Sequence, residues 1–340
     1  MQRMVFLILI LAAPCGSAWA DAPVVQVPRT ITVSLDGSGD FVSIQEAVDS
    51  AKKDDTVFVK PGAYPQNITI HSKERIKLVG AGVDQVTLLG RKDIVGVLHV
   101  GKWPYGATDV EITGLTINEH GGHAVGLFNG KGITLRGLHI KGMLFGQHVQ
   151  DVRIEDCVIG GSETTGVQFA DSQAVLIGNV IHDNDYGVKV AGKSEARLER
   201  NVITGNLFEA VLVSDHAKAK LISNTFVKNG TGASFLGSSR SEASGNIVGL
   251  NRIGFRVAAT SQATFSFNAM FNRESDYMIA GSPNVPAPEL KSESDIAADP
   301  RFVDAEHNDF RLSSETMLLN RGAFAYLGAL PPLKPVSTHP

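Results

Sequence analysis

Residues 175–190 read VLIGNVIHDNDYGVKV, and later segments repeat the pattern: ARLERNVITGNLFEAVLV at 196–213, AKLISNTFVKNGTGASFL at 219–236 and SEASGNIVGLNRIGFRV at 241–257. An asparagine recurs every 22 or 23 residues, as Asn179, Asn201, Asn224, Asn246 and Asn268. A second recurs at the same period, as Asn184, Asn206, Asn229 and Asn251. This period, with apolar alternation inside each unit, is typical of a β-solenoid. The repeat therefore predicts an all-β fold in which each unit forms one coil of a parallel β-helix.

The recurring asparagine has a physical explanation in such a fold. Equivalent residues of successive coils stack about 4.8 Å apart, and each asparagine amide carries both a donor and an acceptor. We expect the stacked amides to hydrogen-bond along the column, at turns whose left-handed geometry asparagine tolerates. The same column is predicted to continue backwards through Asp156, Gly137 and Gly114, which are residue types that favour turns.

The ends of the chain have patterns of their own. Residues 1–20 are typical of a secretory signal peptide, with an apolar run too short to span a membrane and an Ala-Trp-Ala cleavage site. Residues 21–330 are expected to form a single parallel β-helix domain, because solenoids grow by adding coils. Its last part, from residue 299, is expected to fold over the final coils, and residues 331–340 to form a disordered tail. The protein is therefore expected to be a periplasmic or secreted monomer without a membrane span.

Composition argues against several classes of function. The formal net charge of −4 gives no basic signature, so nucleic acid is not an expected partner. Without the signal peptide only Cys157 remains, which excludes an internal disulfide and a cysteine-based zinc site. A buried structural thiol is expected there. No P-loop or Rossmann fingerprint is correctly placed, and no cofactor is expected.

A short helix is predicted before the first coils. Residues 43–46 (SIQE) form a capping box. Apolar residues then follow at helical spacing, as Ile44, Ala47, Val48 and Ala51. This pattern predicts an amphipathic helix of about three turns whose apolar stripe covers the open end of the β-helix, because solenoids need caps.

The sequence around this helix resembles the opening of the pectinesterases. The resemblance lies in TITVSLDGSGDFVSIQEAVDSAKKDDTVFVKPGAYPQNITI at 30–70 and IKLVGAGVDQVTLLG at 76–90. It implies a right-handed parallel β-helix of the pectin-lyase-like type. The family's later motifs, which carry two catalytic aspartates and an arginine, are not found. His123 begins HAVGL where the family has QAVAL, and Gly166 falls near the position of an aspartate. The resemblance therefore implies the fold, and not the standard pectinesterase reaction, which needs a carboxylate nucleophile.

Alignment of the strand after each turn predicts an inward and an outward column. The inward column is Val125, Val167, Val188, Val211 and Phe255, and the outward column is Gly126, His148, Gln168, Lys189, Leu212, Ser234 and Arg256. The catalytic candidates are His148 as a general base, with Lys189 and Arg256 as partners of uronate carboxylates. Gln168 is a candidate to bind sugar hydroxyl groups. The alternative is that a solvent-facing strand carries polar residues without any ligand.

Further candidates lie in loops. Trp103 and Tyr105 either stack on sugar rings or plug the side of a coil. His123 is a candidate for substrate binding; together with His120 it supplies two possible metal ligands but no third, so no metal is expected. Asp183 and Asp185 lack the additional oxygens that calcium needs, and turn residues are expected there.

Two classes of function remain open. The first is an enzyme acting on an acidic uronate polysaccharide as a lyase, an epimerase or an esterase. The second is a non-catalytic glycan-binding or cell-envelope scaffold protein. Convergence of His148, Gln168, Lys189 and a carboxylate in one groove would favour the enzyme. A flat face with scattered charges would favour the binding protein.

Overall fold

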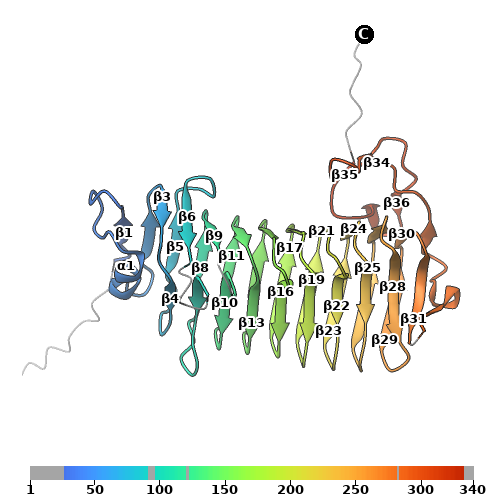
Figure 1. The fold of residues 1–340 in the computed structure, drawn as a ribbon, viewed down its shortest axis with the longest axis horizontal. Helices are drawn as coiled ribbons and strands as arrows, with labels where there is room; N and C mark the ends of the chain where they lie inside the picture. The colour runs from blue at the N-terminus through green and yellow to red at the C-terminus, as the bar shows by residue number, and fades with distance from the viewer. Residues whose placement is uncertain (1–26, 91–95, 120–121, 282, 333–340) are drawn as a thin grey trace, which may run out of the picture.

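Three parallel sheets wind into one elongated solenoid in the computed structural model, which describes residues 27–90, 96–119, 122–281 and 283–332 (Figure 1). A typical coil adds one strand to sheet A, then one to sheet B and one to sheet C, and each sheet has 11 strands. Strands within the sheets pair in parallel, except for the antiparallel last pair of sheet C. The parallel β-helix predicted from the asparagine period is confirmed.

The bounds of the strands are as follows. Sheet A consists of β1 (Thr30–Val33), β2 (Thr56–Val59), β5 (Lys77–Gly80), β8 (Glu111–Thr113), β11 (Thr134–Arg136), β14 (Val152–Glu155), β17 (Gln173–Ile177), β20 (Glu195–Glu199), β23 (Lys218–Ile222), β26 (Arg240–Ser244) and β29 (Gln262–Ser266). Sheet B consists of β3 (Gly62–Tyr64), β6 (Val86–Leu89), β9 (Thr116–Asn118), β12 (His139–Lys141), β15 (Val158–Gly160), β18 (Val180–His182), β21 (Val202–Thr204), β24 (Thr225–Val227), β27 (Ile247–Gly249), β30 (Ala269–Phe271) and β33 (Ile296–Ala297). Sheet C consists of β4 (Ile68–Ile70), β7 (Leu98–Val100), β10 (Val125–Phe128), β13 (Leu144–Gln147), β16 (Thr165–Ala170), β19 (Tyr186–Ala191), β22 (Glu209–Val213), β25 (Thr231–Phe235), β28 (Ile253–Ala258), β31 (Ser275–Ala280) and β32 (Val285–Pro286).

The core fills the space enclosed by the three sheets. The inward column predicted for sheet C is confirmed, because all of its members are fully buried: Val125, Val167, Val188, Val211 and Phe255. Each such side chain contributes about 1.5–3 kcal/mol when it leaves water. Stacking neighbours in register therefore builds one continuous core along the solenoid.

The two asparagine columns form hydrogen-bonded ladders. At the turn from sheet A to sheet B, Asn201 Nδ2 donates to Asn224 Oδ1 at 3.0 Å, and the Asn201 backbone N–H donates to the same oxygen at 3.0 Å. At the turn from sheet B to sheet C, Asn206 Nδ2 donates to Asn229 Oδ1 at 2.9 Å. The predicted amide stacking is confirmed, and each asparagine oxygen satisfies buried amides of the preceding coil.

The prediction that the first asparagine column continues backwards through Asp156, Gly137 and Gly114 was wrong by one residue. The Cys157 N–H donates to Asn179 Oδ1 at 2.9 Å, so Cys157 and not Asp156 stacks on the first asparagine. Asp156, Gly137 and Gly114 have φ angles of +53°, +57° and +68°, as left-handed residues do. The residue directly before each asparagine of this column also has a positive φ. The left-handed position of the turn is thus the one before the asparagine.

Cys157 is a buried free thiol, as predicted. Burial raises its pKa to about 11. A thiol with so high a pKa stays protonated at neutral pH and has little nucleophilic character.

Helix α1 (Ile44–Ser50) covers the N-terminal end of the solenoid (Figure 1). The Ser43 side chain caps it by accepting a hydrogen bond from the Glu46 N–H, as the capping box predicts. Ile44, Ala47 and Val48 are buried. With seven residues, the helix is shorter than the predicted three turns.

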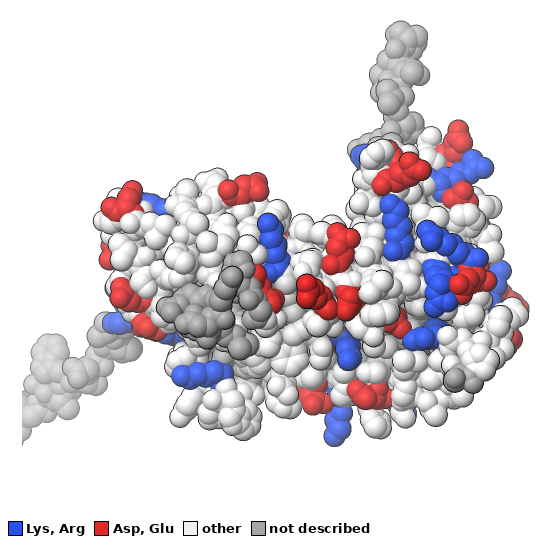
Figure 2. Space-filling view, viewed as in Figure 1, with Lys and Arg blue, Asp and Glu red and all other residues white. Residues whose placement is uncertain are grey.

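The C-terminal residues fold back over the last coils of sheet B, as expected (Figure 1). They contain the hairpins β34 (Phe302–Asp304) with β35 (Asp309–Leu312) and β36 (Leu319–Arg321) with β37 (Phe324–Tyr326). The Ala329 N–H donates to Thr225 Oγ1 of β24 at 2.9 Å. Helix η1 (Pro288–Leu290) precedes this segment. Figure 2 shows that this segment rises beside a lower middle part of the molecule, and that acidic and basic side chains are interspersed over the visible face.

Some predictions concern residues outside the described ranges. The predicted signal peptide at 1–20 lies there, as do residues 333–340 of the predicted tail. Within the described residues, neither helix has the length and hydropathy needed to cross a bilayer.

Candidate functional site

The outer face of sheet C carries an aligned column of polar side chains. Gln168 on β16 pairs in register with Lys189 on β19, which pairs with Leu212 on β22. The column continues through Ser234 on β25 to Arg256 on β28. Adjacent members are about 4.8 Å apart because they occupy neighbouring parallel strands. Gly126 on β10 belongs to the same register, because it pairs with Phe145 on β13, which pairs with Gln168. Six of the seven predicted outward residues therefore stand in one row along the solenoid axis.

His148 does not belong to this row. Phe145 of β13 pairs with Gln168, and so occupies the position predicted for the histidine. His148 follows the end of β13, is exposed and has a φ of +53°. The prediction that His148 lies in the outward column was therefore wrong. Its role as a general base stays a prediction, which the pairing of the strands does not support.

Lys189 is the cation of the row that faces solvent without a close ionic partner among the described residues. Its side chain is half-buried. It lies near Asp215, which follows β22. The Asp215 pKa is lowered chiefly by a hydrogen bond from the Gly192 N–H at 3.0 Å, and further by the Ser214 hydroxyl and the Lys189 ammonium. The ammonium of Lys189 is thus available to an anionic ligand on this face.

Arg256, by contrast, is bound within the protein. Its Nη2 lies 2.6 Å from Glu209 Oε1, and its Nε donates to Ser234 Oγ at 3.1 Å. Ser234 Oγ also donates to Glu209 Oε1 at 3.1 Å. The Arg256 side chain is 22% exposed and that of Glu209 is 8% exposed. The triad uses the Nε–Nη2 edge of the guanidinium, so Arg256 cannot offer this edge to a ligand carboxylate unless the contact opens.

An aromatic pair lies at the edge of this face. The rings of Tyr186, at the start of β19, and Phe208, just before β22, are 5.1 Å apart at an interplanar angle of 38°. Phe208 is 46% exposed and the neighbouring Leu207 is 65% exposed. Exposed rings of this kind can stack on sugar rings. The sequence analysis missed this pair, although both residues follow second-ladder asparagines by two positions, Asn184 and Asn206.

A second aromatic cluster lies on the N-terminal coils of the same sheet. His123 is 5.5 Å from Phe145 and 6.0 Å from His99, measured between ring centroids. His99 also lies 5.6 Å from Phe128. Burial lowers the pKa of both histidines. Neutral imidazoles among aromatic rings pack like other ring side chains, and His99 Nε2 has no hydrogen-bond partner in the described part of the chain.

The remaining loop candidates lie apart from the row. Trp103 and Tyr105 follow β7 and are 79% and 58% exposed, so they do not plug the coil. They lie several coils from Lys189. His120 lies outside the described residues, and within them no group of three or more metal-ligating side chains occurs. Asp183 Oδ2 accepts a hydrogen bond from His182 Nδ1 at 2.8 Å, at a turn.

The face has no room for the missing pectinesterase aspartate at Gly166. A Cβ added there would lie 2.7 Å from Asn184 Nδ2 and 2.9 Å from the Gly187 carbonyl oxygen. The second asparagine ladder therefore occupies the space that a side chain would need. The absence of that aspartate, noted in the sequence, agrees with the packing.

The arrangement is linear. Lys189 and Arg256 are three strands apart, roughly 14 Å at the usual strand spacing. His148 does not lie beside them. The Glu209 carboxylate, which contacts the row, is bound to Arg256 in the triad. A row of this form can contact several units of an extended polymer.

Comparisons with known proteins agree with this architecture. Residues 93–270 match the family model described as right handed beta helix region, and residues 30–102 match the one described as pectinesterase. The resemblance of the N-terminal part to pectinesterases is thereby confirmed.

Individual relatives match over short or divergent stretches. A pectinesterase/pectinesterase inhibitor of Ficus pumila var. awkeotsang is 37% identical over 70 residues, which are 19% of this chain and 13% of that protein. A pectinesterase of Petunia integrifolia is 37% identical over 68 residues, 18% of each chain. The enzymatically active domain of tailspike protein 2 from bacteriophage CBA120 superposes with a TM-score of 0.52 at 11% identity, covering 76% of this chain and 46% of that one. The chain thus spans less than a fifth of the length of these curated relatives, and the tailspike similarity concerns the fold alone.

Proposed function

We propose that this chain, which belongs to the right-handed β-helix family, binds an acidic polysaccharide along the outer face of sheet C. The observation that carries the proposal is the in-register row from Gln168 through Lys189 to Arg256. Its members repeat at about 4.8 Å, a spacing comparable to the length of one sugar unit. A polymer lying along the row meets the half-buried side chains of Gln168, Lys189, Leu212 and Arg256, whereas Ser234 is fully buried.

Charge and stacking support an acidic sugar as the ligand. Lys189 offers an ammonium that can bind a carboxylate by a charge-assisted hydrogen bond. Gln168, one coil earlier, offers an amide that can bind hydroxyl groups. Tyr186 and Phe208 offer ring faces to the sugar. The N-terminal match to pectinesterases, whose name denotes action on pectin, supports a uronate polymer in particular.

A catalytic role is the second candidate, and the Glu209–Ser234–Arg256 triad favours it. The triad places a carboxylate beside an arginine and a hydroxyl on the face where the polymer would lie. A carboxylate is one of the nucleophiles used in covalent catalysis and can also move a proton. Because Glu209 is 8% exposed, the contact with Arg256 must open for it to reach a substrate. A lyase, an epimerase and an esterase each remain part of this candidate.

NMR on uronate polymers incubated with the full chain tests both candidates. The panel contains polygalacturonate, methyl-esterified pectin and alginate. Binding predicts line broadening for at least one polymer, and Lys189→Ala should reduce it. A catalytic protein also produces unsaturated ends, released methanol or a changed epimer ratio, which Glu209→Gln should abolish while broadening remains. Broadening without a product supports the binding protein, whereas no broadening and no product for any polymer overturns both.

The predicted location is in keeping with this proposal. Uronate polysaccharides occur in cell walls and in the extracellular matrix of bacteria, where a protein must be exported to reach them. A periplasmic or secreted monomer, with a signal peptide at 1–20, therefore remains part of the proposed function.

A further inference from the structure

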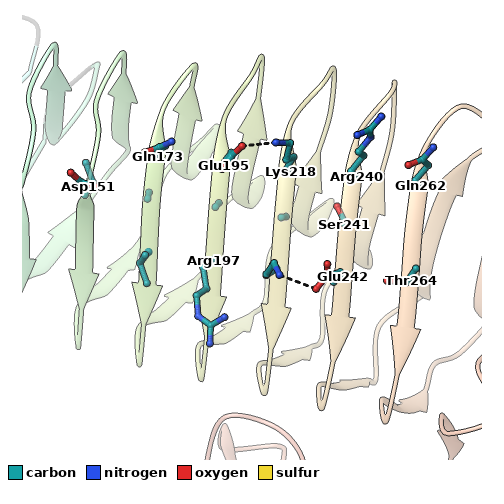
Figure 3. Close-up of a pocket in the computed structure, with 16 residues that line it drawn as sticks. Asp151, Gln173, Glu195, Arg197, Lys218, Arg240, Ser241, Glu242, Gln262 and Thr264 are labelled. Atoms are coloured by element: carbon teal, nitrogen blue, oxygen red, sulfur yellow. Dashed lines mark hydrogen bonds and ion pairs between the residues drawn. The ribbon is translucent and has the colours of Figure 1, made fainter.

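A groove runs along the outer face of sheet A, away from the row on sheet C (Figure 3). Its volume is about 680 Å³, and it extends from Asp151, next to β14, to Gln262 and Thr264 on β29. Figure 3 shows strand after strand contributing side chains to it. A groove that crosses six parallel strands is about 24 Å long at the usual strand spacing.

Strand register builds the two walls of the groove. One wall consists of Gln173, Glu195, Lys218, Arg240 and Gln262, which pair in register on successive strands. The other wall consists of Val175, Arg197, Lys220, Glu242 and Thr264, two residues further along each strand. Each strand contributes one small residue between the two walls, among them Ala174, Ala196 and Ala219. Because the side chains between the walls point into the core, the strand backbone forms the floor of a continuous trough.

The centre of the groove is basic in a protein whose formal net charge is −4. Its lining has four cationic and three acidic residues: Arg197, Lys218, Lys220 and Arg240 against Asp151, Glu195 and Glu242. The four cations lie on three adjacent strands, β20, β23 and β26. Two of the acids, Glu195 and Glu242, lie on the outer two of these strands, β20 and β26, and Asp151 lies at the β14 end of the groove, so the middle strand β23 carries only the two lysines. An anion is therefore attracted to the middle of the groove.

Three of the four cations are available to a ligand, whereas Arg197 is bound to Glu199 at 2.9 Å. Arg240 has no ion-pair partner within the described part of the chain. Lys218 pairs with Glu195 at 2.6 Å, but the two side chains are 57% and 50% exposed. Lys220 pairs with Glu242 at 3.2 Å, again with both side chains more than half exposed. Exposed pairs contribute little to stability, so a ligand carboxylate can replace the protein carboxylate at small cost.

We infer that the groove on sheet A is a second binding surface for an extended anionic polysaccharide. Its carboxylates would contact Lys218, Lys220 and Arg240, and its hydroxyl groups the amides of Gln173 and Gln262. The inference rests on the proposed function for the class of ligand, but its location and residues are independent of the face on sheet C. Two surfaces on one chain hold a polymer more tightly than either alone, if it can reach both.

Isothermal titration of the full chain with polygalacturonate at low ionic strength tests this inference. The double variant Lys218→Ala, Arg240→Ala is expected to bind at least tenfold more weakly than the wild type. Lys77→Ala is the control, since Lys77 is about as exposed as Lys218, at 55% against 57%, and pairs with Glu111 at 3.1 Å on the same sheet, outside the groove. Its affinity should stay within twofold of the wild type. An equal affinity of the double variant and the control overturns the inference.

Other variants separate this inference from the proposed function. Lys189→Ala leaves the groove on sheet A intact. If this variant still binds, and the addition of Lys218→Ala and Arg240→Ala abolishes the remaining binding, the result supports the groove. Binding that Lys189→Ala alone abolishes overturns the groove and leaves the proposed face. Sedimentation of the wild type and Arg240→Glu examines the competing occupant, a second copy of the chain. Dimers that the substitution dissociates would overturn the glycan assignment.

Discussion

Each turn from sheet A to sheet B needs two residue properties at adjacent positions. The first position is left-handed, and glycine, aspartate, arginine, serine and phenylalanine all occur there. The second is buried, and from Asn179 onward it carries an asparagine that is hydrogen-bonded along the column, whereas Leu115, Leu138 and Cys157 occupy it in the earlier coils. The period of the asparagines was therefore readable from the sequence. The left-handed position was not, because its variable residues are held there by the neighbouring coils rather than by their own preference.

Removal of one central rung should destabilise the whole solenoid. Asn224 is fully buried, and its Oδ1 accepts from the backbone and side-chain amides of Asn201. Its Nδ2 donates to the Leu198 carbonyl at 2.9 Å. Asn224→Ala leaves these buried groups unpaired, at about 1–3 kcal/mol each. We expect the free energy of unfolding, measured by urea denaturation, to fall by about 3 kcal/mol or more.

A half-buried asparagine on a strand provides the control. Asn118 of β9 lies in no ladder, so Asn118→Ala should change the free energy of unfolding by less than about 1 kcal/mol. Equal losses for Asn224→Ala and Asn118→Ala would contradict the role assigned to the ladder.

Two buried histidines predict a dependence of stability on pH. Burial lowers the pKa of His99 and His123 in the folded state, whereas unfolded histidine has a pKa of about 6.5. The unfolded chain therefore binds more protons as the pH falls below about 6.5, and the folded state loses stability there. Glu119 opposes this effect at His123 by favouring the imidazolium. The melting temperature of the wild type should fall between about pH 6.5 and 5, and that of His99→Gln, His123→Gln should fall less. Parallel curves for both proteins would refute this explanation.

Elements differ in how far the sequence predicts them. Strands of sheet C were aligned correctly from β16 to β28, where coil length is nearly constant. The alignment failed at β13, because its coil is short: only 19 residues separate Gly137 from Asp156. The coil is shortened in the turn between β12 and β13, because β12 ends at Lys141 and β13 begins at Leu144. Phe145 thereby takes the place predicted for His148.

The elements of the candidate site were predicted in part. Periodicity placed Lys189 and Arg256 on one face, since alternation along a strand fixes which side chains point outward. It could not reveal that Glu209 reaches Arg256, 47 residues away, because that contact depends on side-chain conformation across three coils. The aromatic pair of Tyr186 and Phe208 escaped notice for the same reason.

Helix α1 offers a prediction at the scale of one element. Ser43 accepts a hydrogen bond from the Glu46 N–H at 3.3 Å, and such caps contribute about 1 kcal/mol. Ser43→Ala should lower the free energy of unfolding by about that amount, and Ser43→Thr should retain most of it. The measurement is urea denaturation followed by circular dichroism. A loss as large for threonine as for alanine would show that the hydroxyl does not act as the cap.

At the scale of the whole molecule, the solenoid presents separate outer faces along one axis. Helix α1 covers one end and the C-terminal hairpins cover the last coils of sheet B (Figure 1). Sheet A keeps an exposed row of polar side chains in register over several coils, and sheet C a half-buried row that Leu212 and the buried Ser234 interrupt. Such rows match a linear polymer better than a compact small molecule, because their contacts repeat along the axis.

The proposal that the outer face of sheet C binds an acidic polysaccharide is tested most directly by the affinity of the full chain for polygalacturonate before and after Lys189→Glu. The wild type is expected to show saturable binding that weakens with salt, because exposed charges are screened. The substitution replaces attraction by repulsion on the sheet C face, so the dissociation constant should rise about tenfold or more. That change corresponds to about 1.4 kcal/mol or more. An unchanged dissociation constant, or no saturable binding by the wild type, would contradict the proposal that the sheet C face binds an acidic polysaccharide.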